Sequence, residues 1–132
     1  TRFWITLNEG VEFVVKNFAR MQGGEIFVPK IPSIRITDLV TAMSGKSDYK
    51  LVGIRPGEKL HEIMCPADDA HLTYEFEDFY IISPSIAFVD SNRDFQITNL
   101  QEKGKLVTEG FEYSSGTNNN FLSIKEILEY DN

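Results

Sequence analysis

The sequence predicts an α/β fold for this chain of 132 residues. Short runs of β-branched and aromatic residues, which favour strands, alternate with segments whose apolar residues recur at the spacing of a helix face. The composition, with 42% hydrophobic and 25% charged residues, is ordinary for a globular protein. A chain of this length buries one modest core, so we expect a single α/β unit. The alternation favours parallel strand pairing or the addition of strands to a larger sheet.

The first part of the chain predicts a strand, a helix and a second strand. The apolar run at 3–7 is typical of a strand, and Asn8 can cap a helix that continues to Arg20. The glycine pair that follows ends this helix. Its apolar residues fall at helical spacing: Val11, Val14, Val15 and Phe18. The sequence EIFVPK is then a strand that ends at Pro29, because proline has no N–H to donate to a neighbouring strand.

The middle of the chain predicts two helices around a strand. Apolar residues at helical spacing predict a helix at 37–44, and the sequence YKLVGI predicts a strand at 49–54. A short helix is expected at 58–65. Lys59 and Glu62 are expected on its solvated face.

The last part of the chain is less regular. The acidic stretch 66–78 is expected to be irregular, and the sequence FYIIS at 79–83 predicts a strand. Ser123 followed by Glu126 matches a capping box, which predicts the start of a final helix. Residues 85–120 show the weakest pattern. We therefore expect one domain over the whole chain, with 85–120 as an irregular segment within it.

The charge and apolar content of the chain exclude several classes of partner. The formal net charge is −7, from 20 acidic and 13 basic residues, whereas nucleic-acid binding requires a basic surface. No apolar run is long enough to span a membrane, and no signal-peptide pattern is present. We therefore expect no nucleic acid and no membrane as partners. An anionic ligand would have to be held by a few local arginines against the overall negative field.

The cysteine and histidine content argues against metal binding and nucleophilic catalysis. Cys65 is the only cysteine, which excludes an internal disulfide and favours a reducing, cytoplasmic setting. We interpret Cys65 as a small apolar residue near a helix end, because only His61 and His71 could serve as its base. Tyr80 has no lysine four residues later, and the sequence contains no glycine-rich phosphate loop. We therefore expect no catalytic residue and no metal site in this chain.

The sequence GIRPGEKLHE at 53–62 contains the strongest candidates for a ligand site. Arg55 follows the predicted strand, and ligands usually bind at the carboxyl ends of strands in α/β sheets. Its guanidinium can bind two phosphate oxygens, while Glu58, after a Pro-Gly turn, can accept hydrogen bonds from a ribose diol. A surface ion pair between Arg55 and Glu58 explains the same spacing equally well. Arg2 is a second candidate for phosphate, and a solvated arginine is the alternative.

Three segments of the sequence closely resemble one enzyme family. TRFWITLNEGVEFV, GGEIFVPKIPSIRITDLVTAM and GIRPGEKLHEIM occur in order, and they resemble the C-terminal portion of the inverting UDP-N-acetylglucosamine 4,6-dehydratases. The resemblance runs through 1–83, is weak over 85–120 and returns at 121–128. These enzymes are extended short-chain dehydrogenases/reductases that make the first intermediate of pseudaminic acid. The resemblance implies that the chain is the C-terminal, substrate-binding part of such an enzyme, with the Rossmann half absent from this chain.

The resemblance also implies roles for individual residues. Arg55 looks like the arginine that contacts the UDP diphosphate, Glu58 like the acid on the uridine ribose, and Arg2 like the arginine of a TRF motif that faces the nucleotide. The NADP-binding and catalytic residues of the family lie in the absent half, so this chain would bind no cofactor itself.

The reaction implied for the parent protein is that of a lyase. It oxidises C4 of the sugar, removes water across C5–C6 and returns the hydride to C6 with inversion at C5. As a separate piece, the chain would expose surface that packs on the Rossmann half. We therefore expect it to associate with that half, with other subunits, or with copies of itself as a homo-oligomer.

Two other hypotheses remain open from the sequence. The chain could be the C-terminal part of a UDP-sugar epimerase or reductase of capsule or surface-polysaccharide synthesis, because the chemistry of these enzymes is set in the absent half. It could also be a non-catalytic binding or assembly module. The chain begins with TRFWITLNEG and has no initiator methionine, which favours a piece of a longer protein.

Overall fold

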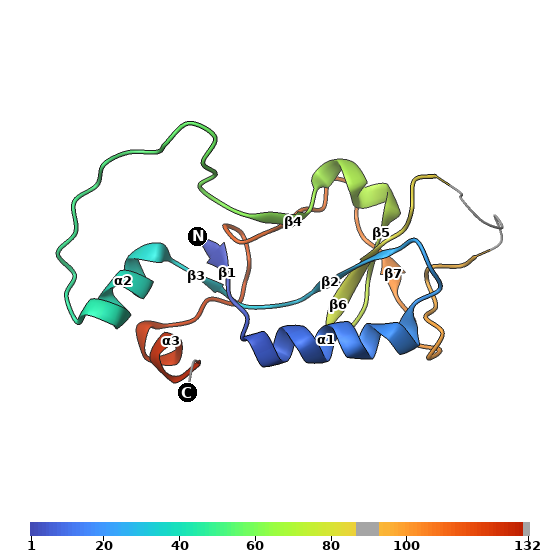
Figure 1. The fold of residues 1–132 in the computed structure, drawn as a ribbon. Coiled ribbons are helices and arrows are strands. Elements are labelled where there is room, and N and C mark those ends of the chain that lie inside the picture. Colours follow the sequence, from blue (N-terminus) through green and yellow to red (C-terminus); the bar gives the residue numbers. More distant parts are fainter. Residues whose placement is uncertain (87–92, 131–132) are drawn as a thin grey trace. The chain divides into compact units, whose positions relative to one another are not determined.

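The computed structural model describes residues 1–86 and 93–130, and the chain divides into two compact units (Figure 1). Unit 1 consists of Thr1–Thr6, Ile31–Ile63 and Ser114–Asn132. Unit 2 consists of Leu7–Lys30 and Met64–Tyr113. Helices and strands occur in both units, so the predicted α/β class is confirmed.

Unit 1 combines two short strands with two helices. Its elements are β1 (Arg2–Phe3), β3 (Ser33–Ile34), α2 (Ile36–Ser44) and α3 (Ile124–Tyr130). β1 and β3 pair in antiparallel orientation, with Arg2 opposite Ile34. The core of the unit is formed by Ile34, Leu122 and Ile127, all buried. Trp4, Leu39, Ala42 and Tyr130 pack around it.

Local sequence signals explain the start of α3 and the end of α2 in unit 1. The N–H of Ser123 donates to Glu126 Oε2 at 2.8 Å, and the N–H of Glu126 contacts Ser123 Oγ at 3.3 Å, as in the predicted capping box. α2 ends at Gly45, whose φ of 67° is left-handed and whose N–H donates to the carbonyl of Thr41 at 2.9 Å. Glycine is favoured at such a position because it has no Cβ to oppose a positive φ.

Unit 2 contains one helix and a four-stranded sheet. Its elements are α1 (Leu7–Arg20), β2 (Ile26–Pro29), the 3-10 helix η1 (Ala67–Leu72), β5 (Thr73–Glu75), β6 (Phe79–Ile82) and β7 (Lys105–Leu106). The strand order is β2-β6-β5-β7, and each neighbouring pair is antiparallel. The expected parallel pairing is therefore wrong for this sheet. β4 (Ile63–Cys65) and β8 (Tyr113–Ser114) form another two-stranded sheet.

The core of unit 2 is aromatic. Phe76 and Phe79 stack with ring centroids 4.6 Å apart, and Ile81 completes the buried cluster. Phe13, Phe27, Tyr74 and Phe95 pack against it. Gly104 leaves room for this cluster, because a Cβ at Gly104 would lie 2.5 Å from Phe76 Cε2.

A buried arginine joins α1 to the segment before β7. Arg20 is only 2% exposed, and its Nε and Nη2 donate to the two carboxylate oxygens of Glu102 at 2.9 and 2.8 Å. Its guanidinium also lies 4.2 Å from the centre of the Phe79 ring. This bidentate pair satisfies the buried charge and holds residue 102 against the end of the helix.

Two predicted elements of the middle segment are wrong. Residues 46–62 form neither the strand expected at 49–54 nor the helix expected from Glu58, and residues 63–65 belong to β4 instead. Leu51 and Val52 are 84% and 80% exposed. A strand needs a neighbour to pair with, and the described residues provide none for this segment.

Other predicted bounds differ by smaller amounts. The strand expected at 3–7 is limited to β1, because α1 begins at Leu7. The acidic stretch 66–78, expected to be irregular, contains η1 and β5. Within 1–86 and 93–130, none of the helices combines the length and apolarity that a membrane span requires.

Candidate functional site

Arg55 and Glu58 lie on either side of a tight turn. The N–H of Glu58 donates to the carbonyl of Arg55 at 3.0 Å, which places Pro56 and Gly57 at the corner. Gly57 has a φ of 80°, the value that a type II turn requires at its third residue. Proline fixes a suitable φ at the second residue, so the Pro-Gly sequence itself explains this local structure.

The turn brings these two predicted site residues together. Glu58 Oε2 accepts a hydrogen bond from the backbone N–H of Arg55 at 2.8 Å, and Oε1 lies 3.9 Å from Arg55 Nε. The Arg55 side chain is 82% exposed, and Glu58 is its guanidinium's only partner among the described residues. An exposed pair of this kind contributes about 0–1 kcal/mol to stability. The guanidinium can therefore turn toward a ligand with little loss of protein stability.

The Arg2 guanidinium binds backbone carbonyls and a carboxylate of this chain. Its Nη2 donates to the carbonyl of Lys59 at 3.2 Å and its Nη1 to that of Leu60 at 3.3 Å. Its Nε lies 3.6 Å from Glu62 Oε1, and the side chain is 32% exposed. The structure thus brings Arg2 to the segment that directly follows the Arg55–Glu58 turn. In this arrangement Arg2 positions that segment.

Glu62 has a structural role that the sequence analysis missed. Its carboxylate accepts a hydrogen bond from the N–H of Phe3 at 2.8 Å, beside its ion pair with Arg2. Its backbone N–H donates to Ser115 Oγ at 2.9 Å, and the N–H of Ser115 donates back to its carbonyl at 2.8 Å. Glu62 therefore does not lie on a solvated helix face. Its partners are more than fifty residues away in sequence, so no local pattern could identify them.

His61 takes part in a small polar network next to Glu62. Its Nδ1 lies 2.8 Å from Thr1 Oγ1, which lies 2.8 Å from the buried Ser115 Oγ. The imidazole lies so close to Gly116 that a Cβ there would be 2.7 Å from the ring. No carboxylate orients this imidazole among the described residues, and Ser115 is fully buried. The network is therefore suited to holding the chain in place rather than to nucleophilic chemistry.

The other reactive side chains belong to the protein interior. Cys65 is fully buried in β4, and burial raises the pKa of its thiol to about 12. Its interpretation as an apolar residue is confirmed. It lies in β4, two residues before η1, and not at the end of the helix expected at 58–65. Burial also raises the pKa of Tyr80 to about 12. Among residues 1–86 and 93–130, no group of three or more His, Cys, Asp or Glu side chains could hold a metal ion.

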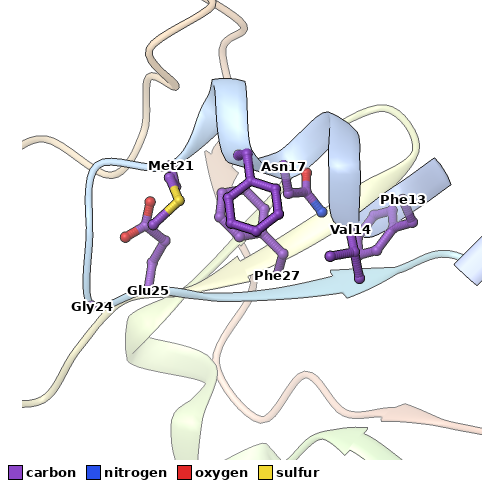
Figure 2. Close-up of a pocket in the computed structure, with 8 residues that line it drawn as sticks. Phe13, Val14, Asn17, Met21, Gly24, Glu25 and Phe27 are labelled. Atoms are coloured by element: carbon purple, nitrogen blue, oxygen red, sulfur yellow. The ribbon is translucent and has the colours of Figure 1, made fainter. Parts of the chain in front are cut away.

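A separate apolar pocket lies in unit 2, between α1 and β2 (Figure 2). Its cavity volume is about 230 Å³. The residues that line it are Phe13, Val14, Asn17, Phe18, Met21, Gly24, Glu25 and Phe27, and we call it the α1–β2 groove. None of the predicted site residues Arg2, Arg55 and Glu58 lines this groove. An apolar lining of this kind is poorly suited to a phosphate group.

Comparison with known proteins relates the whole chain to sugar-nucleotide enzymes. It is 60% identical over its 132 residues to the UDP-N-acetylglucosamine 4,6-dehydratase (inverting) of Campylobacter jejuni, and it covers 40% of that protein. It is 26% identical, over 98% of its length, to the UDP-glucose 4-epimerase of Rickettsia rickettsii, of which it covers 37%. The chain therefore spans about 40% of the length of each of these two relatives.

A solved structure shares the fold of this chain, and a family model matches more than half of its residues. The X-ray structure of Pen from Bacillus thuringiensis shares the fold, with a TM-score of 0.69 and 24% identity over 96% of this chain and 36% of that chain. The resemblance to the inverting dehydratases is confirmed, and it extends over 85–120 as well. The family model described as "Polysaccharide biosynthesis protein" matches residues 1–84. The chain therefore belongs to this polysaccharide biosynthesis protein family.

Proposed function

We propose that this chain is the UDP-sugar-binding portion of an inverting nucleotide-sugar 4,6-dehydratase. The observation that carries this proposal is the 60% identity, over the full chain, to the Campylobacter jejuni dehydratase. The whole enzyme is a cytoplasmic lyase that converts UDP-N-acetylglucosamine into a 4-keto-6-deoxy sugar with inversion at C5, a precursor of pseudaminic acid. Because the chain spans 40% of that relative, we assign to it substrate binding alone. The NADP-binding and catalytic residues belong to the rest of the longer polypeptide.

Arg55 is the proposed phosphate ligand. Its planar guanidinium can donate to two oxygens of a diphosphate, and its exposure leaves those donors accessible. Its Nε lies 3.9 Å from Glu58 Oε1. Hydrogen bonds to a charged group contribute about 1.5–3 kcal/mol, more than the 0–1 kcal/mol of an exposed ion pair. A diphosphate therefore competes successfully with Glu58 for Arg55.

Glu58 is the proposed ribose ligand. One of its carboxylate oxygens, Oε2, is fixed by the N–H of Arg55 at 2.8 Å. This bond orients the carboxylate and leaves Oε1 to accept from vicinal hydroxyls once Arg55 has turned to the phosphates. We call the arrangement in which Arg55 binds the diphosphate and Glu58 the ribose the ligand clamp. The surface ion pair and the ligand clamp are thus two states of one turn.

Arg2 supports the clamp from its other flank. It ties the carbonyls of Lys59 and Leu60 to β1, and so fixes the segment that follows the turn. We also propose that Arg2 faces the nucleotide, as its match to the TRF motif implies. Its contact with a phosphate would use donors that now bind these backbone carbonyls.

The identity of the reaction product tests this function. The full-length polypeptide, incubated with UDP-N-acetylglucosamine and its own bound cofactor, is expected to yield the 4-keto-6-deoxy product with inverted C5, identified by NMR. The C4 epimer of the substrate would instead support a second candidate, a UDP-sugar 4-epimerase. The 26% identity to the Rickettsia rickettsii epimerase favours this candidate. An unchanged substrate would contradict both proposals.

A further inference from the structure

The segment that carries Arg55 and Glu58 is exposed over almost its whole length. Residues 46–62 lead from α2 to β4 without forming a helix or a strand (Figure 1). Every residue from 43 to 61 is exposed, so this part of the chain supplies nothing to the buried core of unit 1. A segment with so little burial keeps its position only where hydrogen bonds and ion pairs hold it.

The Glu62 side chain connects the end of this segment to β1. Its Oε2 accepts a hydrogen bond from the N–H of Phe3 at 2.8 Å, and its Oε1 lies 3.6 Å from Arg2 Nε. β1 pairs in turn with β3, where Ile34 is fully buried in the core of unit 1. The carboxylate of Glu62 therefore ties an exposed segment to a buried part of the same unit.

The backbone of Glu62 is fixed as well. Its N–H donates to Ser115 Oγ at 2.9 Å, and the N–H of Ser115 donates to its carbonyl at 2.8 Å. Ser115 is fully buried. A residue that is held at both its backbone and its side chain can fix the chain next to it, and Glu58 lies only four residues before Glu62 in the sequence.

We infer that Glu62 is a positioning residue for the ligand clamp: it holds the turn between Arg55 and Glu58 where a diphosphate and a ribose can be bound together. The inference rests on the proposed function, because it concerns the same site. Glu62 acts through the turn and contacts no ligand itself, since its carboxylate already binds Phe3 and Arg2. A turn that is fixed before the ligand arrives avoids the ordering cost of binding to a free segment.

Glu62 keeps its bonds to Phe3 and Ser115 in the liganded state. Arg2 now donates to the backbone carbonyls of residues 59 and 60, and it would lose these bonds on turning to a phosphate, as proposed above. The bonds of Glu62 to the N–H of Phe3 and to Ser115 do not involve Arg2. Glu62 is therefore the residue that continues to hold the segment when the clamp is occupied.

A general role in the stability of unit 1 is the alternative explanation of these contacts, and Glu126 provides a control for it. Glu126 Oε2 accepts a hydrogen bond from the N–H of Ser123 at 2.8 Å, the same length as the bond from Phe3 to Glu62. It caps α3 in the same unit and is distant in sequence from 46–62. Glu126→Ala thus removes a comparable bond from unit 1 and leaves the ties of this segment intact.

Calorimetry of UDP binding to the full-length polypeptide tests the inference. The Glu62 side chain is 45% exposed, so the expected effect is that of an ordinary hydrogen bond. Glu62→Ala should weaken the Kd for UDP by about 3- to 10-fold, and Glu126→Ala by about 2-fold or less. Glu62→Gln keeps an oxygen that can accept from the N–H of Phe3, and it is expected to recover part of the lost affinity. The midpoint of thermal unfolding of each variant is measured in parallel without UDP.

Tryptic cleavage after Lys59 provides a second measurement, which contains no UDP. The carbonyl of the cleaved bond is the one that Arg2 Nη2 binds at 3.2 Å, so the segment must leave its ties before a protease can act on it. Cleavage at this bond, followed by mass spectrometry, is expected to be several-fold faster in Glu62→Ala than in Glu126→Ala.

The possible contrary results separate this inference from the proposed function. Equal cleavage rates in Glu62→Ala and Glu126→Ala would show that Glu62 does not hold the segment. Equal UDP affinities of these two variants, beside a weaker affinity of Arg55→Ala, would overturn the inference and leave the proposed function in place. Affinities that follow the unfolding midpoints across all variants would indicate a general loss of stability and would also overturn it. An unchanged affinity of Arg55→Ala would instead overturn the proposed function, and the inference with it.

Discussion

Replacing Glu102 with alanine would remove the main partner of the buried Arg20. The Arg20 side chain is 2% exposed and donates two hydrogen bonds to the Glu102 carboxylate, at 2.9 and 2.8 Å. After the substitution, Arg20 would retain Asn17 Oδ1 at 3.2 Å and Asp78 at 3.6 Å. Its charge would thus remain buried with weaker compensation.

The expected loss of stability is smaller than that for a fully buried ion pair. Breaking a fully buried ion pair by removing one partner costs about 3–5 kcal/mol. Glu102 is itself 36% exposed, and Asp78 remains nearby, so solvent and a second carboxylate screen the orphaned guanidinium. We therefore expect Glu102→Ala to lower the free energy of unfolding by about 1.5–3 kcal/mol, the scale of hydrogen bonds to a charged group.

Urea unfolding followed by circular dichroism measures this change, provided that the slope of the transition is unaltered. Lys16→Ala is the matched control. Lys16 also lies on α1 and pairs with Asp78 at 3.7 Å, but its side chain is 60% exposed. Its loss is expected to cost about 0.5 kcal/mol or less. Equal effects of Glu102→Ala and Lys16→Ala would refute the reasoning that burial makes the Arg20 network important.

Two further predictions concern unit 2. The hydrogen bonds from Arg20 hold the pKa of Glu102 below its usual value of 4.5, so this pair stabilises the folded state above about pH 4.5 and its contribution is lost as pH falls further. Urea midpoints between about pH 6 and pH 3 should therefore decline less in Glu102→Gln than in the unmodified chain, and parallel declines would contradict the assignment. Gly104→Ala should destabilise by about 1–3 kcal/mol, because its Cβ would lie 2.5 Å from Phe76. Gly10→Ala in α1 is the control, because nothing lies within 4 Å of the new Cβ, and it should raise the free energy of unfolding by about 0.5–1 kcal/mol. Equal unfolding midpoints for the two alanine variants would contradict this reasoning.

The elements that could be predicted from the sequence are those with local signals. α3 begins at the Ser123–Glu126 capping box, and α1 ends before the glycine pair that follows it. The Pro-Gly turn between Arg55 and Glu58 was also predictable, because proline and glycine each favour the conformation at their own position.

The sequence could not predict which face of α1 is exposed in the structure. Helical periodicity shows which residues share a face, but it does not show what covers that face. Val11, Val14 and Phe18 do share a face, yet all three are exposed. The apolar run at 49–54 failed as a strand for a related reason, since a strand depends on a partner that its own sequence does not identify.

The site combined predictable and unpredictable parts. The sequence left a surface ion pair and a ligand clamp as equal explanations for Arg55 and Glu58, and the structure shows the pair at 3.9 Å. The clamp stays a prediction. The contacts of Arg2 with Lys59 and Leu60 join residues 57 and 58 positions apart, and no spacing in the sequence indicates them.

The most direct test of the central claim is the affinity of the full-length polypeptide for UDP after Arg55→Ala, measured by calorimetry. Arg35→Ala is the control, because Arg35 forms a similar exposed pair, 3.7 Å from Asp38, three residues away. The loss of about 1.5–3 kcal/mol expected for Arg55→Ala corresponds to a Kd weaker by about 10- to 150-fold, with little change for Arg35→Ala. An Arg55→Ala affinity equal to that of the control would contradict the assignment of this turn as the UDP clamp.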